Sequence, residues 1–477
     1  MTRLPQHGEQ NWGAILNEFL LVAHQENGES RRTRPVINAR EYGAKGDGAN
    51  DDTAALQRAI QAAAGGRTLF IPVGVYSTRK LLLPSDITVC GEGYGSILKL
   101  RDGTLDALFT NQDWTAGNDH ITLRDLRLEG NQSNNVQGES KYFPRSSADQ
   151  DKSHGINFHY VQDSLLENLT VADFYYDGIY LGTSVPDRYS DGEEDRSSGS
   201  NRNTVRQNRI IGNGRNGISI TRGTDNTIVN NLLQDNNRGV LGAAPERSWA
   251  GAITIEPNGD WYDVSRNIVQ SNQLLNNHYN GVQLLKNWTS TGILLSANVI
   301  AGTTRHGIAA GLISGLIIQG NHVSTSGAAG MALGLGTGIQ DAVVSGNVVV
   351  GNGSTGILVN GANGARVVVI ANMAVGNGLT DPYGAGIVWV DAQAVTLVGN
   401  ISLDNGSGPR AQILAAGADP IYAANRVGPL GVPAANRVVR DTDFFAQLWR
   451  MYGSDTEIAL ENQRTGKTYT VPIEQIS

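Results

Sequence analysis

The sequence is poor in the residues that cross-link or stiffen a chain. Among its 477 residues Cys90 is the single cysteine, so no disulfide can form within the chain and the thiol is expected to lie in the core. Only 14 residues are proline whereas 59 are glycine, so glycine and asparagine must make the turns. Aromatic residues make up 6% of the chain, which fits a narrow core of Val, Ile, Leu and Ala.

Three further absences narrow the functional classes. Basic residues form no run and the formal net charge is −8, which argues against a nucleic-acid partner. No apolar segment is long enough to cross a membrane. The opening, MTRLPQHGEQNWG, lacks the uninterrupted apolar segment of a signal peptide. We therefore expect a protein that works in the cytoplasm or leaves the cell without the usual leader.

One short phrase recurs along the chain and predicts the architecture. Each copy has a short alternating strand, an Asn at a bend, a second strand and a turn rich in Asn and Gly, as in NTVRQNRIIGNG. The steps between successive Asn residues are 40, 23, 41, 26, 23, 26, 25 and 28 residues, so the period without two insertions is 23 to 28. Such a period with strands predicts a parallel β-helix whose stacked amides hydrogen-bond along a column. The nine predicted members are Asn168, Asn208, Asn231, Asn272, Asn298, Asn321, Asn347, Asn372 and Asn400.

The chain divides into three predicted parts. Residues 1–34 combine an amphipathic helix with a polar linker and are expected to anchor the protein. Residues 35–434 form the β-helix, whose N-terminal cap includes a helix from about Thr53 to Ala63 that begins after one of two adjacent Asp residues. Residues 435–477 form a C-terminal cap or oligomerisation segment, with a hairpin at Thr465-Gly466. A solenoid needs caps because its end coils would otherwise expose core and strand edges.

Two segments resemble known families. VINAREYGAKGDGANDDTAALQRAIQAA, followed by LFIPVGVY, resembles the opening of the pectate-lyase-like β-helix superfamily, which includes polysaccharide lyases, glycoside hydrolases, mannuronan epimerases and phage tailspikes. With the coils, the resemblance covers roughly residues 36–405 and implies an all-β, right-handed parallel β-helix. NWGAILNEFLLVAH resembles the N-terminal segment of phage or prophage tail-fibre proteins. It implies a homotrimer that assembles in the cytoplasm and acts outside the cell on a virion or secreted particle.

One expected face changes character along the solenoid. A second strand in most coils begins with Gly and an apolar residue, and the residues two and four positions later point outward. In early coils these residues are Asn157, His159, Tyr180, Ser219, Thr221, Thr254, Glu256 and Gln283. In later coils they are Ala309, Gly311, Ala332, Gly334, Leu358, Asn360, Val388 and Val390. The column before the strand reads His154, Asp177, Asn216, Gly251, Asn280, His306, Ala329, Thr355 and Ala385. The fold does not require this gradient, so it indicates a site on the first-half coils.

Long inserts are expected beside this polar face, where they would wall a groove. They fall at about residues 133–153, 183–203, 242–250 and 257–265. Aromatic rings beside a polar groove stack on sugar rings, so we predict a glycan ligand. The predicted substrate-binding residues are Tyr180, Asn157, Gln283, Trp249, Trp261 and Trp288. The alternative is that the tryptophans pin long loops to the body.

The sharpest candidate for chemistry is Glu256, on the outer face of its strand and directly before Pro257. Neighbouring coils are about 4.8 Å apart, so Arg222 on the preceding coil and Lys286 on the following coil are expected beside it. Abstracting a proton next to a sugar carboxylate needs a base and a cation, which this group could supply. The alternative is a surface salt bridge across coils.

A second candidate is the pair of His154 and Asp177, stacked on adjacent coils before the strand. Asp orienting His would make a general acid or base, whereas the alternative is that both cap turn amides. Asp177 and Glu256 are expected roughly 10 Å by 16 Å apart. That is far outside the carboxylate separations of glycosidases, about 5 to 9.5 Å, so we do not predict them as an acid/base pair.

Two further signals bear on cofactor and activity. The acidic loop with Asp187, Asp191, Glu193, Glu194 and Asp195 could bind Ca²⁺, although its spacing matches no standard loop and acidic loops are usually solvated. GVQLLK at 281–286 is similar to mannuronan epimerases, whose catalytic strand ends in Asp-Pro-His. This chain has Gly182-Thr183-Ser184 in the corresponding coil, so the resemblance transfers only Glu256 and does not support epimerase activity.

The sequence thus supports three hypotheses. The leading one is a polysaccharide-active β-helix with lyase or hydrolase chemistry, carried by a homotrimeric tailspike-like protein. The second is a non-catalytic fibre that binds glycan or builds a particle. The third is a free-standing enzyme whose N-terminal helix packs on the cap.

Overall fold

A computed structural model describes most of the β-helix and parts of the C-terminal region. The described residues are 36–135, 153–183, 199–237, 250–257, 262–285, 291–311, 313–335, 338–360, 366–381, 384–390, 394–405, 413–416, 421–423, 425–428, 439–443, 447–453, 457–462 and 468–472. The predicted anchoring helix and linker at 1–34 lie outside these residues.

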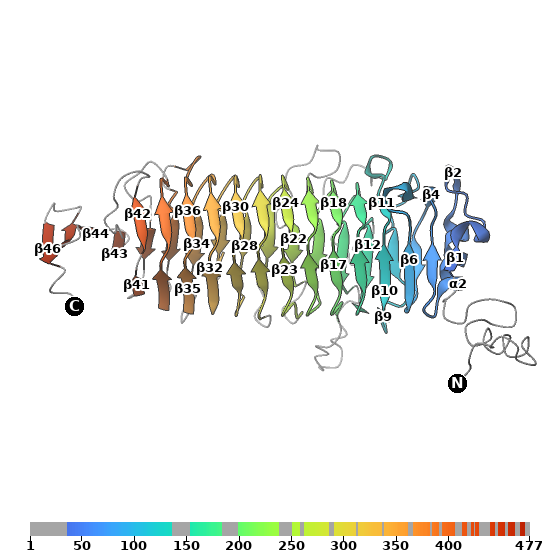
Figure 1. Ribbon diagram of the computed structural model, residues 1–477, viewed down its shortest axis with the longest axis horizontal. Coiled ribbons are helices and arrows are strands. Elements are labelled where there is room, and N and C mark those ends of the chain that lie inside the picture. The colour runs from blue at the N-terminus through green and yellow to red at the C-terminus, as the bar shows by residue number, and fades with distance from the viewer. Residues whose placement is uncertain are drawn as a thin grey trace, which may run out of the picture.

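Within the described residues the chain winds into three long sheets, called sheets 1 to 3 here (Figure 1). Sheet 1 contains β1 (Val36–Asn38), β3 (Thr68–Phe70), β6 (Ile87–Cys90), β10 (Ile121–Arg124), β14 (Leu165–Glu167), β17 (Thr204–Arg206), β20 (Thr227–Val229), β23 (Ile268–Gln270), β26 (Leu294–Ser296), β29 (Ile317–Gln319), β32 (Ala342–Ser345), β35 (Arg366–Ile370), β38 (Ala394–Val398) and β41 (Ile421–Ala423). Sheet 2 contains β2 (Asp47–Asp51), β4 (Gly74–Thr78), β7 (Ser96–Leu100), β11 (Arg127–Glu129), β15 (Thr170–Ala172), β18 (Arg209–Ile211), β21 (Leu232–Gln234), β24 (Gln273–Leu275), β27 (Val299–Ala301), β30 (His322–Ser324), β33 (Val348–Val350), β36 (Met373–Val375), β39 (Ile401–Leu403) and β42 (Arg426–Gly428).

Sheet 3 carries the face that was predicted to hold the site. It contains β5 (Leu81–Leu83), β8 (Phe109–Asn111), β12 (Ile156–His159), β16 (Ile179–Gly182), β19 (Ile218–Ile220), β22 (Gly251–Ile255), β25 (Asn280–Leu284), β28 (Ile308–Ala310), β31 (Met331–Leu333), β34 (Ile357–Asn360), β37 (Ile387–Val390), β40 (Ile413–Ala416), β43 (Val439–Asp443), β44 (Gln447–Gly453), β45 (Glu457–Asn462) and β46 (Thr468–Pro472). A small separate sheet pairs β9 (Asn118–Asp119) with β13 (Val161–Gln162). Three short 3₁₀ turns lie at Ala39–Tyr42, Gly93–Gly95 and Gln132–Asn134.

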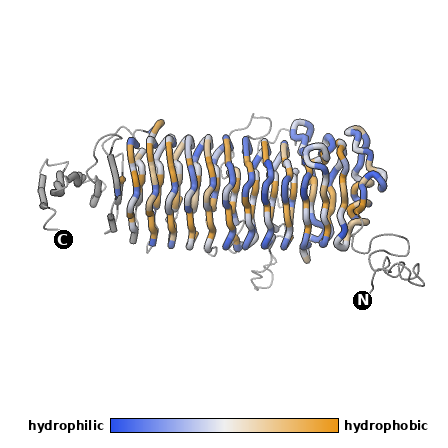
Figure 2. The backbone as a smooth tube through the Cα atoms, in the orientation of Figure 1, coloured by the Kyte–Doolittle hydropathy of each residue, from blue (hydrophilic) through white to orange (hydrophobic). Residues whose placement is uncertain are grey.

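Each coil contributes one strand to each sheet, and each strand pairs in parallel with its equivalent on the next coil. The coil with β17, β18 and β19 buries Val205, Ile210 and Ile218 in the interior. Equivalent apolar side chains stack in register along the solenoid, so Figure 2 shows the same alternation of apolar and polar segments on coil after coil. The parallel β-helix predicted from the recurring phrase is confirmed.

A capping helix closes the N-terminal end of the core, as predicted. α2 (Thr53–Ala63) buries Ala55, Leu56, Ala59, Ile60 and Ala63 against the first coils. Of the two adjacent aspartates, Asp52 occupies the N-cap position but makes no side-chain capping hydrogen bond, and the preceding Asp51 carboxylate accepts from the Thr53 backbone N–H at 3.0 Å. The Asp52 carboxylate instead accepts from the backbone N–H groups of Lys45 and Gly46.

The asparagine column is confirmed, with one member wrong at the N-terminal end and one missed at the C-terminal end. Each Asn donates its backbone N–H and its Nδ2 to the Oδ1 of the Asn on the next coil. The observed members are Asn208, Asn231, Asn272, Asn298, Asn321, Asn347, Asn372, Asn400 and Asn425. Asn168 is not a member. Leu169 takes the column position, since its backbone N–H donates to Asn208 Oδ1 at 2.9 Å. Asn168 occupies the preceding bend with φ of 49°.

Loss of one column amide is expected to be costly. Asn298 accepts from the backbone N–H and Nδ2 of Asn272, both at 3.0 Å, and donates to Asn321 Oδ1. Asn298→Ala would leave buried donors unpaired at about 1–3 kcal/mol each, so we expect the free energy of unfolding to fall by about 3 kcal/mol in urea denaturation. The matched control is Asn168→Gly, which removes an exposed side chain whose Nδ2 donates to Asp125 and keeps the positive φ of 49° without strain. It should change the same free energy by less than about 1 kcal/mol. Equal losses in the two variants would contradict a stabilising role of the column.

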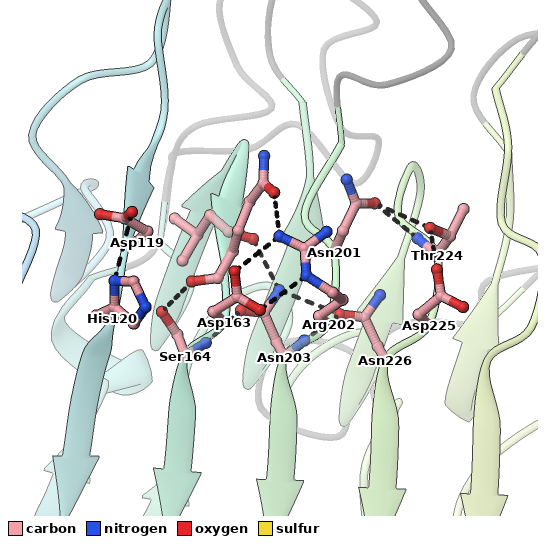
Figure 3. Close-up of polar contacts among 12 residues, drawn as sticks. Asp119, His120, Asp163, Ser164, Asn201, Arg202, Asn203, Thr224, Asp225 and Asn226 are labelled. Atoms are coloured by element: carbon pink, nitrogen blue, oxygen red, sulfur yellow. Dashed lines mark hydrogen bonds and ion pairs between the residues drawn. The ribbon is translucent and has the colours of Figure 1, made fainter.

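The turn that leads into sheet 1 carries a second polar column (Figure 3). Asn203 Nδ2 donates to Asn226 Oδ1 at 3.1 Å. Beside these amides the Arg202 guanidinium donates to both carboxylate oxygens of Asp163 at 2.7 Å. This ion pair is exposed, so it contributes at most about 1 kcal/mol to the free energy of unfolding. It links two adjacent coils.

The C-terminal part is built differently from the coils. β43 continues sheet 3 in parallel with β40, and β44, β45 and β46 then add antiparallel strands. β45 and β46 pair antiparallel through Glu461 and Thr468, as a hairpin requires, and the predicted turn at Thr465-Gly466 lies outside the described residues. The proposed domain boundary at 434 lies outside the described residues and stays a prediction. Among the described helices, none has the length and apolarity to span a membrane.

Candidate functional site on the outer face of sheet 3

The strand register confirms the columns that define the candidate site. Asn157 on β12 pairs with Tyr180 on β16, and the same column continues through Ser219, Thr254 and Gln283. On the later strands the column reads Ala309, Ala332, Leu358 and Val388. The polar members lie on the outside of the sheet but are almost fully buried, with exposed fractions of 0–3%. A polar outer face withdrawn from solvent is therefore confined to the first-half coils.

Asp177 lies at the turn before β16 and is committed to Arg215 on the next coil. The Arg215 guanidinium donates to both Asp177 oxygens, through Nε and one terminal nitrogen, at 2.7 Å. The backbone N–H of Asn216 donates to the same carboxylate at 2.9 Å. Burial favours the protonated form, but the Arg215 charge and these hydrogen bonds hold the pKa of Asp177 below its usual value. Asp177 is thus an ionised, fully buried anchor for Arg215.

The structure brings His154 and Asp177 together, as the column predicted, but with another hydrogen bond than an acid/base pair would use. His154 Nδ1 accepts a hydrogen bond from the Asp177 backbone N–H at 3.3 Å. The same nitrogen is 3.7 Å from the Asp177 carboxylate, beyond hydrogen-bonding distance. The Asp177 backbone, and not its carboxylate, therefore orients the ring. Because this nitrogen accepts, the neutral ring carries its proton on Nε2.

Glu256 follows β22 directly, where its backbone N–H donates to the Ile220 carbonyl at 2.8 Å. Burial raises the pKa of the Glu256 carboxyl; Arg215 opposes this shift and Asp177 adds to it. Arg215, which the sequence did not single out, therefore acts electrostatically on Glu256. The only sequence feature that could have pointed to Arg215 is its position directly before Asn216, a member of the column before the strand.

The strand register and the described residues bear on two expectations about the surroundings of Glu256. Asp177 and Glu256 lie two coils and five strand positions apart, as expected, and the Asp177 charge still raises the pKa of Glu256. Arg222 lies with its guanidinium 4.8 Å from the centre of the Tyr262 ring. Lys286 lies outside the described residues, so the predicted group of Arg222, Glu256 and Lys286 stays a prediction.

A row of neighbouring aromatic rings runs beside Asp177. Trp114 lies 4.4 Å from the His159 ring, between centroids, and His159 lies 5.5 Å from Tyr180. Tyr180 is 5.2 Å from His154, which is 5.3 Å from Tyr176. Burial lowers the pKa of His159 to about 3, with a smaller contribution from His154, so the His159 ring is neutral near neutral pH. Sequence reasoning missed Trp114 because it belongs to the loop after β8, far from the recurring strand pattern.

Several buried polar atoms in these columns have no hydrogen-bond partner among the described residues. They are both amide atoms of Asn157, Nδ2 of Asn216 and Oγ of Ser219. Each such atom costs free energy in a protein interior unless a ligand or water satisfies it. Other predicted groups are satisfied: the Tyr180 hydroxyl donates to the Thr183 carbonyl and accepts from Thr221, and the Gln283 carbonyl accepts from Asn280. The unpaired set fits a polar ligand with many hydroxyl groups.

Several predicted residues fall outside the described part of the chain. They are Trp249, Trp261 and Trp288, and the acidic residues Asp187, Asp191, Glu193, Glu194 and Asp195. Their proposed roles in glycan and Ca²⁺ binding stay predictions. Within the described residues, no group of three or more His, Cys, Asp or Glu side chains could hold a metal ion.

Two models of known protein families match the chain. Residues 246–402 match the family model of the right-handed β-helix region, so the solenoid is a right-handed parallel β-helix. Residues 36–255, which include all described parts of the site up to β22, match the model described as rhamnogalacturonase A/epimerase, pectate lyase-like. The two models together match residues 36–402, which confirms the resemblance to the pectate-lyase-like right-handed β-helix superfamily that the opening segment indicated.

Individual relatives are similar over short stretches. The pre-neck appendage protein of Bacillus phage phi29 is 35% identical over 106 residues, covering 21% of this chain and 12% of that protein. Alginate lyase 7 of Azotobacter vinelandii is 37% identical over 116 residues, covering 21% of this chain and 13% of that protein. The A-module of the mannuronan C-5 epimerase AlgE6 of the same organism shares the fold with a TM-score of 0.59 at 19% identity, over 82% of this chain and 99% of that module. The chain spans only 12–13% of the length of the two curated relatives.

Proposed function

We propose that this protein acts on a uronate-containing polysaccharide at the outer face of sheet 3, by lyase-type β-elimination. The observation that carries the proposal is the Arg215 guanidinium, held by buried Asp177, together with Glu256 on the adjoining coil, whose pKa burial raises and the Arg215 charge lowers. Removing a proton next to a sugar carboxylate requires a base and a cation that stabilises the developing enediolate. Glu256 supplies the base and Arg215 the cation.

In the proposed step Glu256 takes the proton from the carbon next to the sugar carboxylate. The electron pair of that C–H bond forms a C=C bond, and the glycosidic oxygen leaves with its bonding pair and takes a proton from water. Arg215 donates to the sugar carboxylate through Nη1, the terminal nitrogen that does not bond Asp177, while negative charge builds on that carboxylate. A raised pKa makes Glu256 a stronger base once it is ionised.

The surrounding columns supply the polar and flat surfaces that a sugar requires. The unpaired amide of Asn157 and hydroxyl of Ser219 would bind sugar hydroxyls. We also assign Tyr180 and Gln283 to glycan binding, because they lie in the same column as Asn157 and Ser219. Trp114 is partly exposed at the end of the row of rings and offers a flat face for stacking.

Lyase chemistry is favoured over hydrolysis by the state of Asp177. A glycoside hydrolase needs two carboxyl groups that both reach the bond to be broken. Both Asp177 oxygens already accept hydrogen bonds, from the Arg215 guanidinium and from the Asn216 backbone N–H. It therefore serves as a positioning residue and not as a second catalytic carboxyl.

The test is incubation of the whole protein with polymannuronate, polygalacturonate and a neutral glucan. New reducing ends together with ultraviolet absorbance of an unsaturated sugar would support a lyase. Reducing ends alone would replace it with a hydrolase, and no products from any glycan would overturn the enzymatic proposal.

A second candidate is a tailspike-like or fibre component that binds glycan on a particle. Its support is the similarity to the phage phi29 pre-neck appendage protein together with the tail-fibre-like N-terminal segment. We propose a homotrimer for this role, attached to phage tail or contractile-particle proteins through residues 1–34. Light scattering of the full chain should then give three times the mass of one chain, and a monodisperse monomer would contradict the trimer.

A further inference from the structure

The turn before sheet 3 contains the same Tyr–Arg arrangement twice. On the coils of β16 and β19 the Arg215 guanidinium lies 5.6 Å from the centre of the Tyr176 ring. On the coils of β25 and β28 the Arg305 guanidinium lies 4.9 Å from the centre of the Tyr279 ring. The backbone link is also the same, because each Arg N–H donates to the carbonyl of its Tyr, at 3.1 and 2.8 Å.

The two copies differ at one residue that changes the charge. After Tyr176 comes Asp177, whose carboxylate accepts from the Asn216 backbone N–H and fills the fork of Arg215. After Tyr279 comes Asn280, whose Oδ1 accepts from the His306 backbone N–H at 3.1 Å in the same way. Asn280 is neutral, so the second copy keeps the backbone arrangement but lacks the carboxylate.

Arg305 is consequently an exposed cation that is held in place but not neutralised. Its guanidinium stacks on Tyr279 and donates one hydrogen bond to the Tyr279 hydroxyl. It forms no ion pair with a carboxylate within the described residues. Burial, together with the Arg305 charge, lowers the pKa of the adjacent His306 to about 4, so His306 does not add a second positive charge near neutral pH. A guanidinium fork in this state matches an external carboxylate or sulfate.

The position of Arg305 relative to Arg215 indicates how an extended ligand would lie on the solenoid. Arg215, Glu256 and Arg305 belong to coils of sheet 3 that follow one another through β19, β22, β25 and β28. Three coil steps of about 4.8 Å separate the two arginines by about 14 Å. An extended anionic chain parallel to the solenoid axis along this turn column would contact Arg215 and, three coils further on, Arg305.

We propose that Tyr279 and Arg305 form a second anion-binding subsite, which takes an acidic group of the same polysaccharide several sugars away from the bond that is broken. This inference rests on the proposed function. In the subsite the ligand's carboxylate or sulfate takes the place that Asp177 occupies in the first copy.

The experiment measures binding by calorimetry in full-length protein carrying Glu256→Gln, so that no turnover occurs. Arg305→Gln should weaken the affinity for polymannuronate oligomers by about 10- to 100-fold, because a charge-assisted hydrogen bond is lost. Arg305→Lys should recover part of that loss. The matched control is Arg209→Gln, which removes an exposed arginine from sheet 2 and should leave the affinity unchanged.

Asn280→Asp provides a test that removes no contact with the ligand. The new carboxylate should fill the Arg305 fork as Asp177 fills that of Arg215, and so weaken oligomer binding to a similar degree. A sulfated glycan tested in parallel distinguishes sulfate from carboxylate as the bound group, and dextran should show no dependence on Arg305. Affinities within twofold of the parent in both Arg305→Gln and Asn280→Asp would overturn the subsite. Absence of turnover by wild-type protein would instead refute the proposed lyase, whatever the binding result.

Discussion

Glu256→Gln should lower turnover of the acidic polysaccharide by about 10²- to 10⁴-fold, the contribution expected of a general base. Glutamine has the same shape but cannot accept the proton, so the thermal unfolding temperature should stay unchanged. Because the base acts in its ionised form, wild-type kcat/KM should rise with pH as Glu256 ionises. Its raised pKa places this rise above the usual value of 4.5.

The control for this substitution is Glu167→Gln, on the outer face of sheet 1. Glu167 forms an ion pair with Arg206 at 2.7 Å, far from the columns of sheet 3 in the coil. The substitution makes the same chemical change and should leave turnover as in wild type. Full activity in Glu256→Gln, or an equal loss in both variants, would remove Glu256 from the mechanism.

Asp177→Asn should have the second-largest effect, through Arg215. The Asp177 charge raises the pKa of Glu256 and Arg215 lowers it. Replacing the carboxylate by an amide removes the first influence and releases Arg215 toward Glu256, and both changes lower the pKa of Glu256. The acid limb of kcat/KM should therefore move to lower pH, and kcat should fall because Arg215 loses its anchor.

Asp177→Asn should also lower the free energy of unfolding by about 3 kcal/mol, which is the lower end of the range for breaking a buried ion pair. The lower end applies because 27% of the Arg215 side chain stays exposed. The pKa of Asp177 is lowered in the folded protein, so its stabilising contribution exists above the unfolded pKa and disappears as pH falls through the folded one. The variant should lack this acid-sensitive part of the stability.

Asp163→Asn separates these effects from the general loss of an Asp–Arg pair. Asp163 also accepts two hydrogen bonds of 2.7 Å from one arginine, Arg202, but at an exposed corner before sheet 1. We expect a stability change below about 1 kcal/mol and an unchanged pH profile. An unshifted acid limb in Asp177→Asn would show that Asp177 only supports the fold.

The fold was predictable because its stabilising interactions repeat. The column from Asn208 onward must occupy one position per coil to stack, so its spacing in the sequence carries the register directly. The error at Asn168 has a physical cause. The bend position before the column requires a left-handed backbone, which Asn tolerates, so an Asn there imitates a column member.

The site was predictable only in part, because chemistry does not repeat. The columns correctly placed His154 beside Asp177 and aligned Asn157 with Tyr180. The dominant partner of Asp177 was missed, because a long arginine side chain reaches across coils and its direction is not encoded in strand alternation. Trp114 was missed because a loop brings it over His159, and no periodic signal marks such a loop.

The asparagine column also separates the length of the molecule from its chemistry. It continues through Asn347, Asn372 and Asn400, coils whose outer face on sheet 3 is apolar and carries none of the proposed site. Each such coil acts as a spacer of about 4.8 Å. Adding or deleting whole coils there would lengthen or shorten the distance from the site to the C-terminal strands while the first-half geometry stays intact. Reach and reactivity can therefore vary independently in this architecture.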